Sequence, residues 1–221
     1  MNKPDRSQPV ATIPLKGMRG VVARQMLLSL RDGAQLTLHR IVDAGGMTRF
    51  RSSFDAGSRP TYNDIMLACA VAALTRHPEV NATLEEDVIR QWGHVNIGFA
   101  VAVDAGLVVP VIHEAQAKTL DEIAAATADL GARAREGKLK MPEIADGTFT
   151  VSNLGALGID FFTPIISPPQ VAILGVGRIH EGRIGLSLTI DHRALDGAPG
   201  ARFLGDLASA LATPEDIIGA G

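Results

Sequence analysis

The sequence predicts an α/β domain with two layers, a mixed β-sheet and helices packed on one side of it. Two segments in the second half, TFTVS (148–152) and RIGLSLTID (183–191), alternate apolar and polar residues, which is typical of strands with one buried face. The segment 65–74 is almost entirely apolar, which is typical of a central, buried helix. Helical and strand segments follow one another without strict alternation, and this order favours a mixed sheet.

The first half of the chain is expected to contain two helices and several strands. GMRGVVARQMLLSL (17–30) has apolar residues at helical spacing, and QLTLHRIVD (35–43) alternates as a strand does. Thr61 is a suitable N-cap for a helix that stops at His77-Pro78. Further strands are expected at VIRQW (88–92), VNIGFAVAV (95–103) and LVVPVI (107–112).

The second half is expected to contain two more helices around three strands. Thr119-Leu120-Asp121-Glu122 matches the capping-box pattern, so a helix should run from Leu120 to about Glu136 and end at Gly137. SPPQVAILGVG (167–177) is expected to be a buried strand entered through a rigid turn, between the alternating strands 148–152 and 183–191. The last helix should run from about Ala198 to Leu211.

The composition is that of a globular protein, 46% hydrophobic and 20% charged over 221 residues. A net charge of −3 gives no bulk attraction to nucleic acid or to an anionic membrane. No apolar run reaches membrane-spanning length, and the N-terminus lacks the apolar core of a signal peptide. The single cysteine, Cys69, lies in an apolar run and is expected to be a buried, inert thiol in a reducing compartment. We therefore expect a cytoplasmic or organelle-matrix protein.

The chain is expected to form one domain. Residues 1–12 are polar and contain proline, so they are expected to be a linker or disordered lead-in. From Ile13 onward there is no second linker, no repeat and no low-complexity segment. The domain is therefore expected to span residues 13–221.

The stretch LTIDHRALDGAPG (188–200) places a histidine where an apolar strand ends. A rigid strand end can present the His192 side chain to a cleft. An imidazole has an ordinary pKa of about 6.5, which suits it to take a proton from a thiol with a pKa of about 8.5. Asp196 could order the following loop or receive an arginine. The same pattern also fits a strand that simply ends in a polar turn before a helix, so both interpretations stay open.

Ser152 ends the strand 148–152 on its polar face, before the glycine-rich turn in SNLGALG. A hydroxyl at this place could donate to an oxyanion that forms during acyl transfer. Serine and asparagine followed by glycine are also ordinary turn residues, so the motif alone favours a turn.

Metal and nucleotide sites are not expected. The histidines other than His192 show no ligand spacing, and the chain has one cysteine and no HExxH or CxxC pattern. These histidines are His39, His77, His94, His113 and His180. No Walker or GxGxxG pattern is present either.

Taken together, four segments resemble the catalytic domain of the 2-oxoacid dehydrogenase acyltransferases, the dihydrolipoamide acyltransferase family. The resemblance covers residues 13 to about 216 and is most specific in the last two segments, in combination and in order. The segments are IPLKGMRGVVARQM, VNIGFAVAVDAGLVVPVI, GTFTVSNLGALGIDFFTPIISPPQVAILGVG and DHRALDGAPGARFL.

The resemblance implies the fold of chloramphenicol acetyltransferase and assembly as homotrimers, which could associate further into a cubic (octahedral) or icosahedral core. In such a trimer the active site lies in a channel between neighbouring subunits, with coenzyme A entering from one end and the lipoyl group from the other. The C-terminal PEDIIGAG could support contacts between trimers through Ile217 and Ile218.

The resemblance also implies roles for individual residues. His192 matches the catalytic histidine, Asp196 the acidic residue of the same motif, and Ser152 the hydroxyl that stabilises the tetrahedral intermediate from the adjacent subunit. Arg19 is a candidate partner for Asp196. Coenzyme A contacts are expected at Arg51, Thr61, Ser152, Asn153, Gly177 and Ile179, with Arg51 as the natural phosphate partner. The implied reaction is acyl transfer between dihydrolipoamide and coenzyme A, with His192 as general base and without a metal.

Three departures from the family pattern bear on this interpretation. No lipoyl domain or peripheral-subunit-binding domain precedes the catalytic segments, so we expect an excised core or a short, free-standing relative. Its lipoyl group would then come from a separate domain or chain, and dehydrogenase component subunits are possible partners. The segment between Gly177 and His192 is shorter than usual, which puts the coenzyme A edge of the site in doubt. Ala34-Gln35 stands where the family often has Pro-His.

Two other functions remain open at this stage. The chain could be a free-standing acyltransferase that uses coenzyme A with an acceptor other than lipoamide. It could instead be a non-catalytic assembly subunit, but such a subunit would be expected to lose the histidine, and His192 is present.

Overall fold

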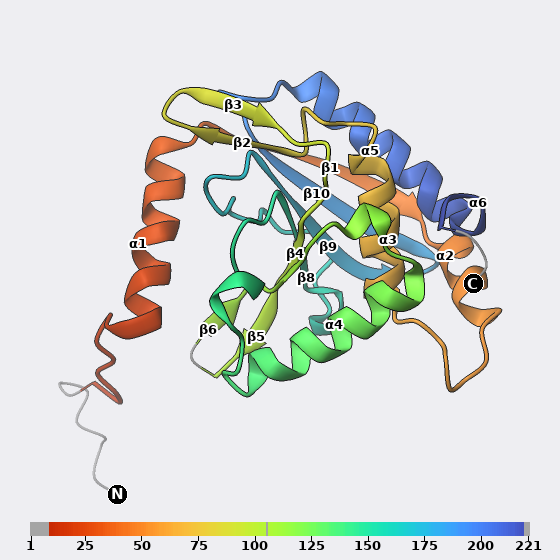
Figure 1. Cartoon of the computed structure of the whole chain (residues 1–221), viewed down its shortest axis with the longest axis horizontal. Helices are drawn as coiled ribbons and strands as arrows, with labels where there is room; N and C mark the ends of the chain where they lie inside the picture. The colour runs from red at the N-terminus through yellow and green to blue at the C-terminus, as the bar shows by residue number, and fades with distance from the viewer. Residues whose placement is uncertain (1–8, 105, 219–221) are drawn as a thin grey trace, which may run out of the picture.

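The computed structural model describes residues 9–104 and 106–218 and contains one large sheet, two small ones and a layer of helices (Figure 1). The large sheet has six strands in the order β1-β10-β9-β8-β4-β7. β8 pairs in parallel with β4 and β9 and the other pairs are antiparallel, so the predicted mixed sheet is confirmed. The strands are β1 (Gln35–Asp43), β4 (Ile97–Phe99), β7 (Val111–Ile112), β8 (Phe149–Asn153), β9 (Ala172–His180) and β10 (Arg183–Asp191).

Two hairpins lie outside the large sheet, and helices cover one of its faces. Helix α5 packs on β1 and β10, and α3 contacts both α5 and α4. The hairpins are β2 (Ala82–Glu85) with β3 (Val88–Gln91), and β5 (Val101–Val103) with β6 (Gly106–Val108). The helices are α1 (Gly17–Asp32), α2 (Gly45–Ser52), α3 (Tyr62–Leu74), α4 (Leu120–Arg135), α5 (Gly197–Ala212) and α6 (Pro214–Ile218), with 3₁₀ turns at Ala115–Ala117, Met141–Glu143 and Gly155–Leu157.

Apolar and polar residues alternate along β1 and β10, so the apolar side chains lie on the face of the sheet that the helices cover. Leu38 pairs with Leu188 and Leu36 with Ile190, and both β10 residues are fully buried. A Cβ atom on Gly200 of α5 would lie 3.1 Å from Leu38 and 3.3 Å from Leu188. The absence of a side chain at Gly200 therefore lets α5 approach the sheet closely.

The opposite face of the sheet carries small polar residues and is covered by the chain between β8 and β9. Thr37 and Thr189 have their hydroxyl oxygens 2.8 Å apart, and the Thr150 hydroxyl donates to Gln170 at 2.7 Å. The covering segment lies so close that a Cβ on Gly175 would be 3.0 Å from Phe162. Both faces of the central strands are therefore buried within one chain.

A buried carboxylate joins α3 to α4 beneath the N-terminus of α3. The predicted Thr61 N-cap is confirmed: its hydroxyl accepts from the Asp64 N–H, and Asp64 Oδ2 accepts from the Thr61 N–H at 2.8 Å. The other carboxylate oxygen accepts from the Thr127 hydroxyl of α4 at 2.6 Å. Asp64 is only 4% exposed. The predicted capping box at Thr119 and Glu122 is confirmed as well.

The structure differs from the sequence prediction at five places. α2, β2 and α6 were not predicted, since all three are short and lack a clear apolar period. The segment 107–112, predicted as one strand, is divided between β6 of a small hairpin and β7 of the large sheet. The segment 95–103, predicted as one strand, breaks at Ala100. The Ala100 N–H bonds to the Val151 carbonyl of β8, and the next residues leave the large sheet to pair with β6.

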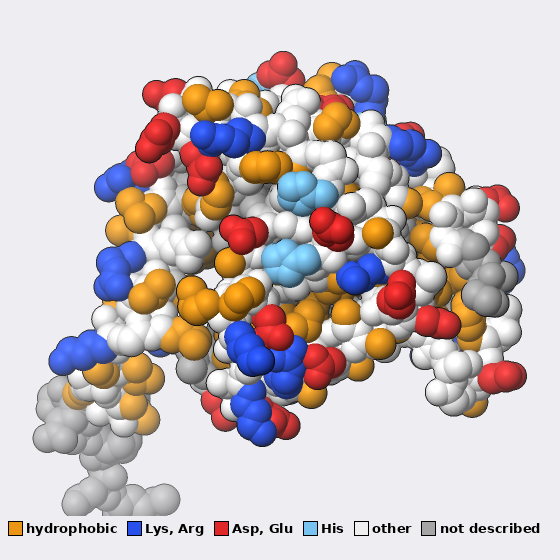
Figure 2. Space-filling view, in the orientation of Figure 1, with side chains coloured by type: hydrophobic (Ala, Val, Ile, Leu, Met, Phe, Trp, Pro, Cys, Tyr) orange, Lys and Arg blue, Asp and Glu red, His pale blue; other side chains and the backbone are white. Residues whose placement is uncertain are grey.

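Helix α1 confirms the helix predicted at 17–30 but stands apart from the sheet (Figure 1). Hydrophobic and basic side chains alternate along it in the space-filling view (Figure 2). It meets the domain near both of its ends: the Ser29 hydroxyl donates to the Ile166 carbonyl at 2.6 Å, and Arg19 lies beside Gly106 of β6. Its exposed apolar residues are Met18, Val21, Leu27, Leu28 and Leu30. The lead-in predicted for residues 1–12 lies largely outside the described residues; residues 9–12 are exposed and form no helix or strand.

Replacing Thr127 by valine should destabilise the domain. Thr127→Val keeps the shape of the side chain but removes a hydrogen bond to the buried Asp64 carboxylate, an interaction worth about 1.5–3 kcal/mol. We expect a lower midpoint in urea unfolding at matched protein concentration. The control is Thr75→Val, because the Thr75 side chain is exposed and its hydroxyl donates to the Ala72 carbonyl. An unchanged midpoint for Thr127→Val would show that the hydrogen bond between Thr127 and Asp64 does not contribute to the stability of the domain.

Candidate active site

His192 lies immediately after β10, where the sequence predicts it. Its backbone N–H donates to the Ala34 carbonyl at 2.8 Å, and its imidazole side chain is 46% exposed. The Nδ1 atom is 3.6 Å from Asp196 Oδ1, which is longer than a hydrogen bond. The side chain at Asp196, the N-cap of α5, is 80% exposed. Asp196 is therefore an electrostatic neighbour of His192 and does not fix it by a direct bond.

The arginine proposed for Asp196 is not found there. Arg19 begins α1 and lies beside Gly106, and within residues 9–104 and 106–218 Asp196 has no ion pair with any arginine. The expected pairing of Arg19 and Asp196 within one chain is therefore wrong. The physical reason is that Arg19, near the start of α1, lies beside the β5–β6 hairpin, whereas Asp196 caps α5 after the end of β10.

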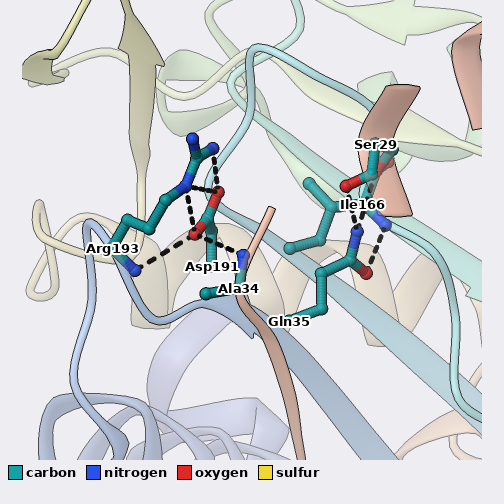
Figure 3. Close-up of polar contacts among 6 residues, drawn as sticks. All are labelled: Ser29, Ala34, Gln35, Ile166, Asp191 and Arg193. Carbon is teal, nitrogen blue, oxygen red and sulfur yellow. Dashed lines mark hydrogen bonds and ion pairs between the residues drawn. The ribbon is translucent and has the colours of Figure 1, made fainter. Parts of the chain in front are cut away.

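The two residues that flank His192 form an ion pair that the sequence analysis did not predict (Figure 3). The Asp191 carboxylate accepts from Arg193 Nη2 at 2.6 Å and from Arg193 Nε at 3.0 Å. Burial raises the pKa of the Asp191 carboxyl, but hydrogen bonds from Arg193 and from the Ala34 N–H lower it, and the net pKa is below the ordinary value. The signal in the sequence is the order Asp-His-Arg, in which opposite charges enclose the histidine.

Ser152 lies near the end of β8, far from His192 of the same chain. Ser152 pairs with Gly175 of β9, which in turn pairs with Ser187 of β10. His192 follows Ser187 by five residues, or roughly 16 Å at about 3.3 Å per residue, and β8 is two strands away from β10. The two predicted catalytic residues therefore do not meet within one chain.

A cavity of about 740 Å³ opens where β4 and β8 end, beside the N-terminus of α3. Of the predicted coenzyme A contacts, Thr61, Asn153, Gly177 and Ile179 line it. Ser152 and Arg51 do not. The Ser152 side chain points to the opposite face of the sheet, because neighbouring residues in a strand alternate between faces.

Arg51 packs on the ring of Tyr62, which lines the cavity. The guanidinium carbon lies 4.8 Å from the centre of the Tyr62 ring, and Nε donates to the Pro60 carbonyl at 2.9 Å. Arg51 thus remains a cation at the rim of the cavity and is not in its wall.

The wall holds two other arginines that the sequence analysis missed. Arg178 is bound by Asp160 at 2.6 Å, whereas Arg135 donates only to the Gly131 carbonyl and has no carboxylate partner within the described part of the chain. Two residues earlier, Arg133 lies outside the wall and is bound by Asp129 and Glu143. Arg133 lowers the pKa of Glu143 to about 2. The position of Arg135 in the last turn of the predicted helix was visible in the sequence, but its free charge was not.

Neither the cysteine nor a metal-binding cluster offers a second reactive site in the described residues. Burial raises the pKa of the Cys69 thiol to about 12, so this thiol stays protonated, as predicted for an inert cysteine. Within the described residues, no group of three or more His, Cys, Asp and Glu side chains could hold a metal ion. In the same part of the chain, no helix combines the length and the apolar character needed to span a bilayer.

Sequence comparison identifies relatives over nearly the whole chain. Residues 7–219 match the family model for the 2-oxoacid dehydrogenases acyltransferase catalytic domain. The chain is 37% identical to a dihydrolipoyllysine-residue acetyltransferase component of an acetoin cleaving system from Bacillus subtilis, over 98% of this chain and 59% of the relative. It is also 37% identical to the corresponding component of the mitochondrial pyruvate dehydrogenase complex of Schizosaccharomyces pombe, over 93% and 47%. The chain thus spans about half the length of these curated relatives.

Solved structures with the same fold include three informative cases. A dihydrolipoamide acetyltransferase from Azotobacter vinelandii superimposes with a TM-score of 0.89 at 31% identity and 96% coverage of both chains. A truncated catalytic core of the 2-oxoacid dehydrogenase complex from Thermoplasma acidophilum gives 0.88 at 35% identity, covering 92% of this chain and 99% of that one. A chloramphenicol acetyltransferase gives 0.59 at 17% identity, covering 90% and 98%, which confirms the predicted fold. The chain therefore belongs to the catalytic domain family of the 2-oxoacid dehydrogenase acyltransferases.

Proposed function

We propose that residues 13–221 form an acyltransferase domain that moves an acyl group between the thiols of a dihydrolipoyl group and of coenzyme A. The observation that carries the proposal is His192 at a rigid strand end, with a half-exposed imidazole, in a chain that also holds a large cavity beside α3. Relatives that are named as dihydrolipoyllysine-residue acetyltransferases support the choice of substrates.

The proposed reaction is direct transfer between two thiols. His192 removes the proton from one thiol, and the resulting thiolate attacks the thioester carbonyl of the other substrate. The Ser152 hydroxyl donates a hydrogen bond to the oxyanion of the tetrahedral intermediate. When the intermediate collapses, the carbon–sulfur bond to the original carrier breaks, and that thiolate takes its proton from His192. The reaction consumes no metal or redox cofactor.

The catalytic assignments are supported by a study of a relative. The Azotobacter vinelandii structure was determined to examine a serine, a histidine and an asparagine in the catalytic mechanism of its dihydrolipoamide acetyltransferase. That asparagine follows the histidine by four residues, as Asp196 follows His192 here. We therefore assign the roles of base and oxyanion donor to His192 and Ser152, and a supporting role to Asp196.

The site is proposed to be complete only in a homotrimer. Ser152 and His192 are too far apart within one chain, so a second copy has to supply one of them. Helix α1 carries exposed apolar residues and makes few contacts with its own domain, as an arm that packs on a neighbour would. A cubic core of a pyruvate dehydrogenase complex, with a TM-score of 0.89 at 30% identity, supports assembly of trimers into a larger shell. Ile217 and Ile218 of α6 line a groove with α3 that could take part in such contacts.

Coenzyme A is proposed to occupy the cavity lined by Thr61, Asn153, Gly177 and Ile179. Arg51 at its rim and Arg135 in its wall supply the positive charge that the phosphates need. The lipoyl group would come from a carrier domain of the same or another chain, and dehydrogenase components would be further partners. The cytoplasm or an organelle matrix would be the corresponding compartment.

Replacing His192 by alanine should remove nearly all turnover. General acid–base catalysis contributes about 10²–10⁴-fold, so His192→Ala should lower kcat by at least the lower value. Coenzyme A affinity, measured by calorimetry, should stay near wild type because His192 does not line the cavity. Asp196→Asn is the matched variant and should keep most activity. If His192→Ala retains more than about a tenth of wild-type turnover, His192 is not the base.

Mixing two inactive variants should restore activity if the site is shared. In a cyclic trimer that contains both His192→Ala and Ser152→Ala chains, one interface of three combines an intact His192 with an intact Ser152. Mixed trimers isolated through two affinity tags should therefore have about a third of wild-type turnover. The control mixes His192→Ala with the double variant, which cannot form an intact site. Mixed trimers as inactive as this control would contradict a site built from two subunits.

Replacing Arg135 by glutamine should weaken coenzyme A binding. Loss of a charge-assisted hydrogen bond costs about 1.5–3 kcal/mol, so the KM for coenzyme A should rise by about tenfold or more. Arg133→Gln is the control on the same helix, because Arg133 is held by Asp129 and Glu143 outside the cavity wall. Equal KM values for the two variants would remove Arg135 from the coenzyme A site.

A further inference from the structure

The residues on either side of His192 are bonded to each other across it. Arg193 donates to the Asp191 carboxylate through Nη2 at 2.6 Å and through Nε to both oxygens, at 3.0 and 3.1 Å. The Arg193 backbone N–H donates to the same carboxylate at 3.1 Å. His192 thus sits at the tip of a short turn whose two sides are joined by a carboxylate and a guanidinium.

The same turn is tied to the residue that precedes β1. The Ala34 N–H donates to Asp191 Oδ1 at 3.3 Å, and the Ala34 carbonyl accepts from the His192 N–H at 2.8 Å. Both backbone polar groups of Ala34 are therefore used to hold the turn. The chain is continuous through Asp191, His192 and Arg193, so the direction of the His192 Cα–Cβ bond is fixed by these contacts.

Ala34 is itself anchored by the side chain of the next residue (Figure 3). Gln35 Nε2 donates to the Ser29 hydroxyl at 2.8 Å, and Gln35 Oε1 accepts from the Ile166 N–H at 3.4 Å. Gln35 therefore joins the end of α1, the start of β1 and the segment that covers the sheet. The turn at His192 is tied to three rigid parts of the fold.

The imidazole, by contrast, is held weakly by its own contacts. Asp196 is the side chain that forms an ion-pair contact with it in the described part of the chain, at 3.6 Å and from an exposed position. A general base has to stand within a fraction of an ångström of its productive place. The position of the imidazole therefore has to be fixed through the backbone, and the hydrogen bonds of Asp191 with Arg193 and Ala34 fix that backbone.

We propose that Asp191 and Arg193 are positioning residues for the base at His192: they place its imidazole by fixing the backbone on both sides of it. This inference rests on the proposed function, in which His192 is the base. Asp191 is buried, with only 6% exposure, so removal of Arg193 would leave a largely buried carboxylate without the partner of its charge. Loss of Arg193 should therefore disturb the turn directly.

A double-mutant cycle separates positioning from a general structural role. Arg193→Gln should lower kcat by roughly 10- to 100-fold, because a misplacement of about 1 Å costs on the order of 10²-fold. The KM for coenzyme A and the size of the assembly should not change. In the His192→Ala background, Arg193→Gln should have no further effect on the residual rate, because the group that it positions is absent.

Two comparison variants complete the experiment. Arg193→Lys keeps the charge but not the two-pronged geometry, and should recover part of the lost kcat. It also serves as the test variant if Arg193→Gln does not assemble. Arg90→Gln removes an exposed arginine–glutamate pair in the β2–β3 hairpin and should leave kcat unchanged.

Three outcomes would overturn the inference. Arg193→Gln could keep wild-type kcat, could lower the rate equally with and without His192, or could act on the KM for coenzyme A alone. Failure of the proposed function gives a different result: the wild-type protein would show no acyl transfer, or the single variant His192→Ala would retain turnover.

Discussion

The register of β10 between β1 and β9 is the constraint on which the rest of the molecule depends. β10 pairs with β1 along its whole length and with β9 along most of it. A shift by one residue would send Leu188 and Ile190 away from α5 and would place Thr189 against that helix. Because burial on both faces of β10 forbids such a shift, the strand ends at Asp191 and His192 emerges at one defined place. The position of the proposed base is thus a consequence of how the core packs.

The same register separates the two halves of the proposed chemistry. β8 lies two strands from β10, and Ser152 is level with Ser187 rather than with His192. No side-chain rotation closes a gap of roughly 16 Å along a rigid sheet, since consecutive strand residues are about 3.3 Å apart. In the proposed mechanism activity therefore requires association, because a fully folded monomer would hold the proposed oxyanion donor and the proposed base in two incomplete sites. For such a protein, turnover and assembly should depend on concentration together.

Local signals in the sequence predicted much of this fold, and long-range pairing explains most of what they missed. Patterns within a few residues predicted the N-cap at Thr61, the capping box at Thr119, the strand 183–191 and His192 at its end. The break at Ala100 depends on a hydrogen bond to Val151, which no local pattern contains.

The pairing of charged side chains also depends on contacts between residues that lie far apart in the sequence. Arg178 and Arg135 look alike in the sequence, and only the fold brings Asp160 to the first and leaves the second without a carboxylate in the described residues. For helix α1, the spacing of the apolar residues predicted a helix but did not identify the surface against which its apolar side packs.

The ion pair of Asp191 and Arg193 illustrates why a charged contact is placed where an apolar one could be more stable. Desolvating a carboxylate costs free energy, and replacing a buried pair by well-packed apolar residues is often neutral or stabilising. An apolar pair, however, could not accept the backbone N–H groups of Ala34 and Arg193, which converge on Asp191 Oδ1. Those N–H groups would then be left without partners at the end of the sheet, and the turn would lose its defined shape. The charge at Asp191 thus fixes the shape of the turn more than it adds to net stability. This turn carries His192, whose proposed role as a base requires a defined position.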